Sequence, residues 1–286
     1  MRPVPPQLLL LGSIGSVQFG AAFAARLFDQ AGPGGIVLLR LGLSAAILLA
    51  VARPSVRGRT RSDVLSAVAF GVVLGGMNWS FYEALDRLPL GIAVTIEFLG
   101  PLGVAVAGSR RALDGLWIVL AGGGVVLIAL RGSHAGVTAL GIVLVLIAAA
   151  CWACYILLSK RVGSVFPALD GLAIALGVGT LITLPAGIVE GGSALGRPEV
   201  LAGGLAVALL SSLIPYSLEI VALRRLRPSA FGLLMSLEPA VAALAGVLVL
   251  SQPLSGVLAV AIAMVIVASV GTTLTSRHQS VPQVLD

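Results

Sequence analysis

The chain alternates long apolar runs with short segments that hold charges, glycine or proline. A helix needs about 20 apolar residues to cross the hydrocarbon core of a bilayer. Ten runs approach or exceed that length, at 7–27, 34–52, 64–85, 90–108, 113–130, 137–158, 168–189, 200–223, 229–250 and 254–274. The pattern predicts an all-α polytopic membrane protein with ten transmembrane helices, although the close spacing of the third to fifth runs leaves counts of nine and eleven open.

Composition supports a membrane environment over an aqueous one. Apolar residues make up 58% of the chain, charged residues 10%, and the mean hydropathy is +1.08. The net charge of +6 could suggest nucleic-acid binding, but that requires basic residues gathered on one solvated face. Here they lie in short clusters between apolar runs. We therefore expect contact with membrane lipid and no nucleic-acid partner.

The basic residues also predict an orientation. With ten spans and a cytoplasmic N-terminus, thirteen of them fall on the cytoplasmic side and four, excluding Arg40, on the other side. Cytoplasmic loops of membrane proteins carry an excess of Lys and Arg. The thirteen are Arg2, Arg53, Arg57, Arg59, Arg61, Arg110, Arg111, Lys160, Arg161, Arg224, Arg225, Arg227 and Arg277. This bias predicts that both termini are cytoplasmic.

Two segments of the chain repeat one another. Residues 84–108 align without a gap to residues 222–246, at a constant offset of 138, and nine of the 25 positions are identical. An odd number of predicted spans separates the two segments, so they enter the membrane from opposite sides. We expect two inverted five-helix repeats, at 1–134 and 135–286. Such repeats favour a substrate site near the bilayer midplane and alternating access to it.

Two acidic residues lie near the middle of uncharged apolar runs, Glu97 in the fourth span and Glu238 in the ninth. A charge at that depth is costly and usually functional, and low polarity favours the neutral, protonated form of a carboxyl group. Both are candidates for substrate binding or proton coupling, although either could instead satisfy helix backbone groups. Pro101 and Pro239 follow these acids and each removes one helical hydrogen bond, which predicts helix breaks beside a central site.

Further polar residues fall within the spans. Arg40 could pair with a substrate carboxylate, neutralise one of the acids or reach the outer interface. Glu219 follows Tyr216 in a polar segment of the eighth span and is a cavity candidate. Asn78 and Tyr82 are four residues apart, so they share a helix face and either bond across helices or face a ligand.

The sequence lacks the residues that several kinds of chemistry require. There is no glycine-rich loop followed by Lys-Ser/Thr for ATP, and the two cysteines, Cys151 and Cys154, lack the further ligands of a zinc site. No nucleophile with a base in reach is evident in the spans. We expect neither an enzyme nor a cofactor or metal.

The motifs resemble those of the threonine/homoserine exporters, which are EamA-type transporters of the drug/metabolite transporter superfamily. The resemblance spans nearly the whole chain. It rests on Gly76-Met77-Asn78 through Tyr82, Pro89 through Val94, Glu97-Phe98, Gly100-Pro101-Leu102, Ser109-Arg110-Arg111, Ala150 through Ala153, Pro215 through Glu219 and Met235 through Ala240.

The resemblance implies proton-driven export of small neutral amino acids, such as threonine and homoserine, across the bacterial inner membrane by a monomer or homodimer. The partners would be the amino-acid substrate and protons. An alternative keeps the fold and changes the cargo to an amino-acid analogue, a purine or a cytotoxic amine. A passive channel or a membrane scaffold is the alternative from another class.

Overall fold

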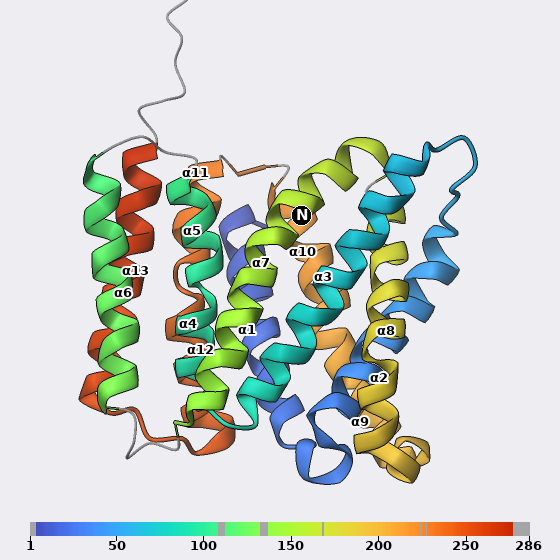
Figure 1. The fold of residues 1–286 in the computed structure, drawn as a ribbon, viewed down its shortest axis with the longest axis horizontal. Helices are drawn as coiled ribbons and strands as arrows, with labels where there is room; N and C mark the ends of the chain where they lie inside the picture. Colours follow the sequence, from blue (N-terminus) through green and yellow to red (C-terminus); the bar gives the residue numbers. More distant parts are fainter. Residues whose placement is uncertain are drawn as a thin grey trace, which may run out of the picture.

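The computed structural model describes residues 4–107, 112–131, 137–167, 169–223, 225–226 and 228–276, and these ranges contain helices and no strand. Figure 1 shows the helices running between two ends of a bundle. They are α1 (Pro6–Ala25), α2 (Phe28–Ala52), α3 (Arg61–Leu85), α4 (Leu90–Glu97), α5 (Leu99–Ala107), α6 (Ala112–Arg131), α7 (Ala139–Val165), α8 (Asp170–Gly191), the 3₁₀-helix η2 (Gly192–Gly196), α9 (Pro198–Ala208), the π-helix η3 (Leu209–Leu213), α10 (Ile214–Leu223), α11 (Pro228–Met235), α12 (Glu238–Leu250) and α13 (Gly256–Ser276).

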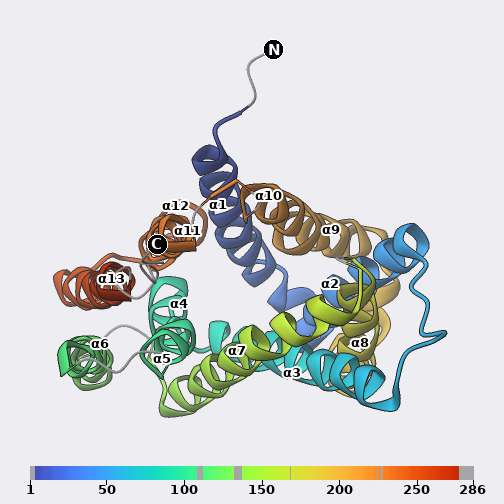
Figure 2. The ribbon, with the colours of Figure 1, turned by 90° about the horizontal axis from the view of Figure 1, so that it is seen from above.

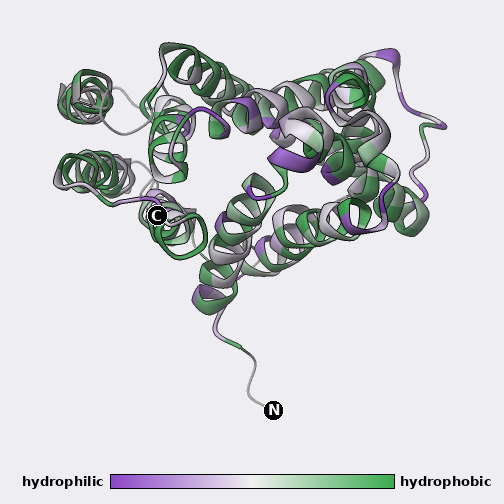
Figure 3. Cartoon of the chain, turned by 90° about the horizontal axis from the view of Figure 1, so that it is seen from below, coloured by the Kyte–Doolittle hydropathy of each residue, from purple (hydrophilic) through white to green (hydrophobic). Residues whose placement is uncertain are grey.

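Nine helical segments in the described ranges are long and apolar enough to cross a membrane, some of them formed by two consecutive helices. The predicted span at 113–130 corresponds to α6, whose apolar part is the shorter stretch Gly115–Ile128. Large apolar side chains such as Val119, Leu130 and Val189 are exposed, and Figure 3 shows apolar residues along most of the helices. The chain is a multi-pass, all-α integral membrane protein, and the count of ten stays a prediction.

The prolines predicted to break helices lie beside such breaks. α4 ends at Glu97 and α5 begins at Leu99, and Pro101 cannot donate to the carbonyl of Glu97. Likewise α11 ends at Met235. Pro239, four residues later, has no N–H that could donate to the carbonyl of Met235. The helices α4 and α11 each have eight residues, and their bounds are 138 positions apart. This correspondence supports the repeat, which remains a prediction.

Two helices, α2 and α7, extend well beyond their predicted bounds. α2 begins at Phe28 instead of residue 34, because the chain stays helical on both sides of a kink at Gly32, where φ is 67°. Only glycine adopts this conformation readily. α7 continues to Val165, well past residue 158. The polar residues after position 158 end the apolar run, but they do not break the helix.

Some predictions fall outside the described residues. These are the repeat boundary at 134/135, the motif residues Ser109-Arg110-Arg111, and six of the thirteen basic residues assigned to the cytoplasmic side, Arg2, Arg110, Arg111, Arg224, Arg227 and Arg277.

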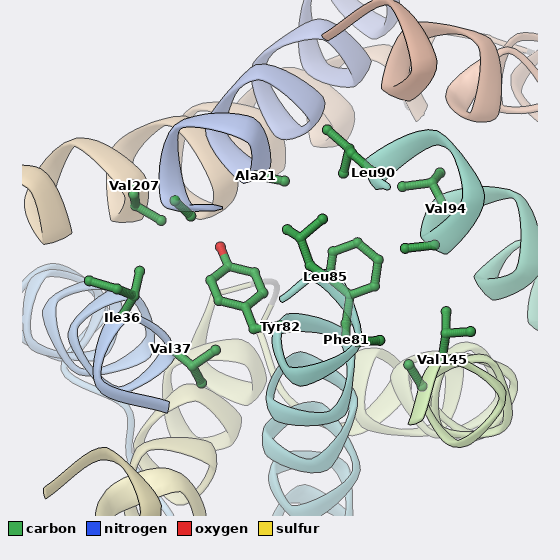
Figure 4. Close-up of a cluster of buried hydrophobic side chains, with 14 of the residues drawn as sticks. Ala21, Ile36, Val37, Phe81, Tyr82, Leu85, Leu90, Val94, Val145 and Val207 are labelled. Atoms are coloured by element: carbon green, nitrogen blue, oxygen red, sulfur yellow. The ribbon is translucent and has the colours of Figure 1, made fainter. Parts of the chain in front are cut away.

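Seen from above, α1, α2, α3, α7, α9, α10 and the two broken helices surround a central region, while α6 and α13 pack together at one side (Figure 2). Small residues permit close crossings: a Cβ on Gly75 would lie 2.9 Å from Gly179 Cα, and one on Gly91 would lie 2.9 Å from Ala243 Cβ. Gly71 and Gly75, four residues apart on α3, therefore mark its contact with α8. Buried side chains from α1, α2, α3, α4, α7 and α9 form a hydrophobic core cluster (Figure 4).

Candidate functional site

A cavity of about 600 Å³ lies between the two broken helices and the helices α1, α2, α3, α7, α10 and α13. Its size is within the range of small-molecule sites, roughly 300–1,000 Å³. Seven of the nine residues predicted for the site line it: Arg40, Asn78, Glu97, Pro101, Tyr216, Glu219 and Glu238. Tyr82 and Pro239 are not among the lining residues. The cavity thus gathers one cation and three carboxylates from segments distant in the sequence.

Arg40 is half-buried and is held by neutral groups. Its Nε donates to Ser212 Oγ at 3.3 Å, Nη1 to Tyr82 Oη at 3.2 Å, and Nη2 to the carbonyl oxygen of Ser211 at 2.8 Å. No carboxylate of the described residues lies within 4 Å of the guanidinium. A guanidinium has five N–H donors. The three bonds therefore leave two donors without a partner in the described part of the chain.

The carbonyl that binds Arg40 is made available by the local sequence. Pro215 has no N–H to donate to the carbonyl of Ser211, four residues earlier. The helix also widens into a π-helical turn over Leu209–Leu213, in which the N–H of Ile214 bonds to the carbonyl of Leu209. Such turns are frequent at functional sites. Pro215 and the π-turn together release an acceptor toward the guanidinium.

Tyr82 supports Arg40 from outside the cavity. Its side chain is fully buried, and the guanidinium carbon lies 5.4 Å from the centre of its ring. Figure 4 shows the phenol oxygen between the segments that carry Ala21 and Val207, with Ile36 and Val37 of α2 nearby. The structure therefore places Tyr82 as a support for Arg40, whereas the sequence left a ligand-facing position open.

Glu97 and Glu238 are nearly inaccessible, at 9% and 6% exposure. Neither carboxylate has a hydrogen bond or an ion pair with a described residue. Glu97 is the last residue of α4 and Glu238 the first of α12, so both stand at the helix breaks. The positive charge of Arg40 acts on Glu97, whereas the charges that act on Glu238 are those of Glu219 and Glu97. Two buried acids thus face the cavity unpaired.

Glu219 has a different setting. Its Oε1 accepts a hydrogen bond from Ser13 Oγ of α1 at 2.7 Å. With Tyr155, Ser159 and Tyr216 it also borders a second cavity of about 230 Å³, which reaches the end of α7 and the start of α8. Glu219 therefore lies between the two cavities.

Asn78 lines the central cavity and is buried. Its Nδ2 donates to the carbonyl of Leu74 at 2.8 Å, four residues earlier on α3. Its side-chain oxygen has no protein partner among the described residues. Asn78 lines the cavity and Tyr82 does not, so the helix face shared by the two stays a prediction.

The sequence did not single out Gln18. It is 3% exposed on α1, it lines the cavity, and its Oε1 is buried without a hydrogen-bond partner. The available signal was an amide in the middle of an apolar span. Trp152 also lines the cavity, where it meets the ring of Phe98 edge-on at a centroid distance of 5.9 Å.

The two ends of the bundle differ. The cavity lining reaches Ser159 near the end of α7 and Thr273 near the end of α13, on the side where α11 begins (Figure 1). At the opposite end, Arg26 Nε donates to the carbonyl of Val249 at 2.8 Å. There the N–H of Leu90 also donates to Gln252 Oε1 at 2.9 Å. These bonds join the end of α1 to the last turn of α12, and the start of α4 to the segment after α12.

No group of three potential metal ligands occurs in the described ranges. The arrangement offers what a small zwitterion needs, a cation for its carboxylate and carboxylates for its ammonium group, in a mostly apolar space.

Comparisons with known proteins identify the family of the chain. The EamA-like transporter family matches residues 139–274. Over 98% of this chain and 94% of the relative, the sequence is 43% identical to a Salmonella typhimurium protein named threonine/homoserine exporter RhtA. It is also 43% identical to the Escherichia coli K12 protein of that name, over 100% of this chain and 98% of the relative. A crystal structure that is 21% identical superposes with a TM-score of 0.65, covering 96% of this chain and 99% of that one, and so shares the fold. The chain belongs to the EamA-like transporter family of the drug/metabolite transporter superfamily, whose members are transporters and not enzymes.

Proposed function

We propose that this protein is a secondary transporter of the bacterial inner membrane that exports small neutral amino acids of the threonine and homoserine class. We further propose that export is coupled to proton entry by alternating access. The observation that carries the proposal is the central cavity, in which two donors of Arg40 and two buried carboxylates have no partner among the described residues. The identity to proteins named as exporters supports the substrate class.

Each end of an amino acid has a matching group in the cavity. Arg40 binds the substrate carboxylate through its two remaining N–H donors, since a guanidinium matches a carboxylate in shape and charge. Glu97 binds the ammonium group, because it is the acid on which the charge of Arg40 acts. The two charged groups of an amino acid are close together, so the acid that binds the ammonium group must lie near the arginine.

The other acids of the cavity serve in proton coupling. An empty cavity with three carboxylates and one guanidinium holds an excess of negative charge that protons can neutralise. Among the described residues, the charges that act on Glu238 are those of two other acids, Glu219 and Glu97, so we assign it the coupling proton. It takes up the proton from the outer side and releases it when a substrate enters from the cytoplasm.

The asymmetry of the bundle fits alternating access. With the predicted orientation, the cavity reaches the cytoplasmic end, and the bonds of Arg26 and Gln252 close the outer end. This is the state in which an exporter loads. The breaks in α4–α5 and α11–α12 provide the two corresponding places where the halves can rock against each other.

The test is efflux of radiolabelled threonine and homoserine from preloaded cells that express the chain, with and without a protonophore. We expect efflux that the protonophore abolishes, and its loss in Glu97→Gln and Glu238→Gln. Glu199→Gln, an exposed acid at the start of α9, is the matched control and should export normally. Efflux that persists unchanged in both cavity variants would refute the mechanism. No efflux from a correctly inserted protein would favour another cargo, such as a purine or a cytotoxic amine.

A further inference from the structure

The carboxamide of Gln18 is an unused polar group in the cavity. Gln18 lies on α1 with Val17 and Ala21, which also line the cavity, and its side chain is 3% exposed. It forms no hydrogen bond with any described residue, and its Oε1 is sealed from solvent. Buried polar groups are nearly always hydrogen-bonded, and an unpaired one is costly. Gln18 therefore has a carboxamide that the described residues leave unpaired and that a ligand could pair with.

The surrounding residues show which part of a ligand Gln18 would meet. Arg40 and the acids are the charged groups among the described lining residues, and they account for the charged ends of an amino acid. Gln18 is neutral, so it suits the side chain of the substrate. An amide can donate and accept at once, through its nitrogen and its oxygen. A hydroxyl group also donates and accepts, so the two can form a complementary pair.

Two other neutral groups of the cavity, Asn78 and Ser211, are less available. The side-chain nitrogen of Asn78 is bonded to the carbonyl of Leu74. Ser211 Oγ has no hydrogen-bond partner, but it lies against Gly20, where a Cβ would overlap it, so that hydroxyl faces the backbone of α1. Among these polar groups, Gln18 is the one whose donor and acceptor are both uncommitted.

We propose that Gln18 is a specificity-determining residue, whose carboxamide binds the side-chain hydroxyl of the substrate and so selects hydroxylated amino acids over apolar ones of the same shape. This inference rests on the proposed function and deepens it. Threonine and valine have nearly the same shape, as do homoserine and norvaline. A cavity that only measures size would bind the members of each pair equally.

The test measures competition with radiolabelled threonine for binding to the purified protein in detergent. Wild type should bind threonine better than valine, and homoserine better than norvaline, by roughly ten-fold, the scale of one buried hydrogen bond. Gln18→Met keeps the length of the side chain and removes its hydrogen bonds, so both preferences should fall to nearly one. Gln7→Met is the control, since Gln7 is exposed on the same helix and should leave both preferences intact.

A measurement on wild type alone guards against a misfolded variant. O-methylhomoserine accepts a hydrogen bond but cannot donate one, and we expect it to compete roughly ten-fold less well than homoserine. Equal competition by the two would overturn the inference, as would an unchanged threonine-to-valine preference in folded Gln18→Met. Both results leave the exporter proposal standing. If wild type binds neither threonine nor homoserine, the substrate class and this inference fail together.

Discussion

Tyr82 holds Arg40 by two contacts at once, a hydrogen bond from Nη1 to Oη of 3.2 Å and a ring centre 5.4 Å from the guanidinium carbon. The ring is itself fixed by Phe28, whose centroid lies 5.7 Å away. The arginine on the cavity surface is therefore oriented by a residue that the cavity does not reach. The proposed binding of a substrate carboxylate depends on this orientation.

The first prediction separates the two contacts. Tyr82→Phe removes the hydrogen bond and keeps the ring, so threonine affinity should fall about two- to ten-fold, corresponding to about 0.5–1.5 kcal/mol. Tyr82→Leu also removes the cation–π contact and should cost more. Titration of the purified variants with threonine measures both. Trp79→Phe, at an exposed position on the same helix, should bind like wild type. Equal affinity of Tyr82→Phe and wild type would mean that Arg40 needs no help from the phenol oxygen.

A second prediction separates substrate binding from proton coupling. Glu97→Gln should weaken threonine binding by roughly ten- to hundred-fold, since a charge-assisted hydrogen bond is replaced by a neutral one. Glu238→Gln should bind threonine normally and still exchange internal for external threonine, because exchange needs no net proton movement. It should lose efflux driven by a pH gradient. Exchange assays in proteoliposomes, with and without the gradient, distinguish the two variants. The reverse pattern would interchange the roles of the two acids.

A third prediction concerns the crossing of α4 and α12. A Cβ on Gly91 would lie 2.9 Å from both Cα and Cβ of Ala243, so Gly91→Ala must push the helices apart. Overpacking of this kind costs about 1–3 kcal/mol. Gly103→Ala on α5 adds the same methyl group where no atom lies within 4 Å, and it should be neutral or stabilising. Thermal unfolding in detergent compares the two. A Gly91→Ala protein as stable as wild type would show that this crossing is loosely packed.

Much of this architecture could be predicted from the sequence, because the physical signals are strong. Long apolar runs need no tertiary information to be assigned to helices in a membrane. Glu97, Glu238 and Arg40 could be chosen because a charge within such a run is rare and costly. Pro101 and Pro239 indicated breaks because each removes a backbone donor at a known position.

The remaining features depend on tertiary contacts. Gln18 is neutral, and a single amide in an apolar span gives a weak signal unless its missing partner is known. Nothing in the sequence indicates that Ser211 and Ser212 bind Arg40, 171 and 172 positions away. The kink at Gly32 is stabilised from α8, where Glu190 Oε2 accepts a hydrogen bond from the N–H of Gly34 at 2.6 Å. Such contacts follow from the fold and could not be read from local pattern.

The last prediction tests the orientation of the bundle and the side on which the cavity opens. The background protein has Cys151 and Cys154 replaced by alanine. A single cysteine then marks each end of the bundle, either at Arg57 in the α2–α3 loop or at Leu254 between α12 and α13. An impermeant maleimide should label Leu254→Cys in spheroplasts and Arg57→Cys only in inverted vesicles, because the excess of basic residues favours the cytoplasm for the latter loop. Ser159→Cys, on the cavity surface, should follow Arg57→Cys and be protected by threonine. If Ser159→Cys is labelled from the same side as Leu254→Cys, the cavity opens outward. If Leu254→Cys is labelled only in inverted vesicles, the predicted orientation is the reverse of the true one.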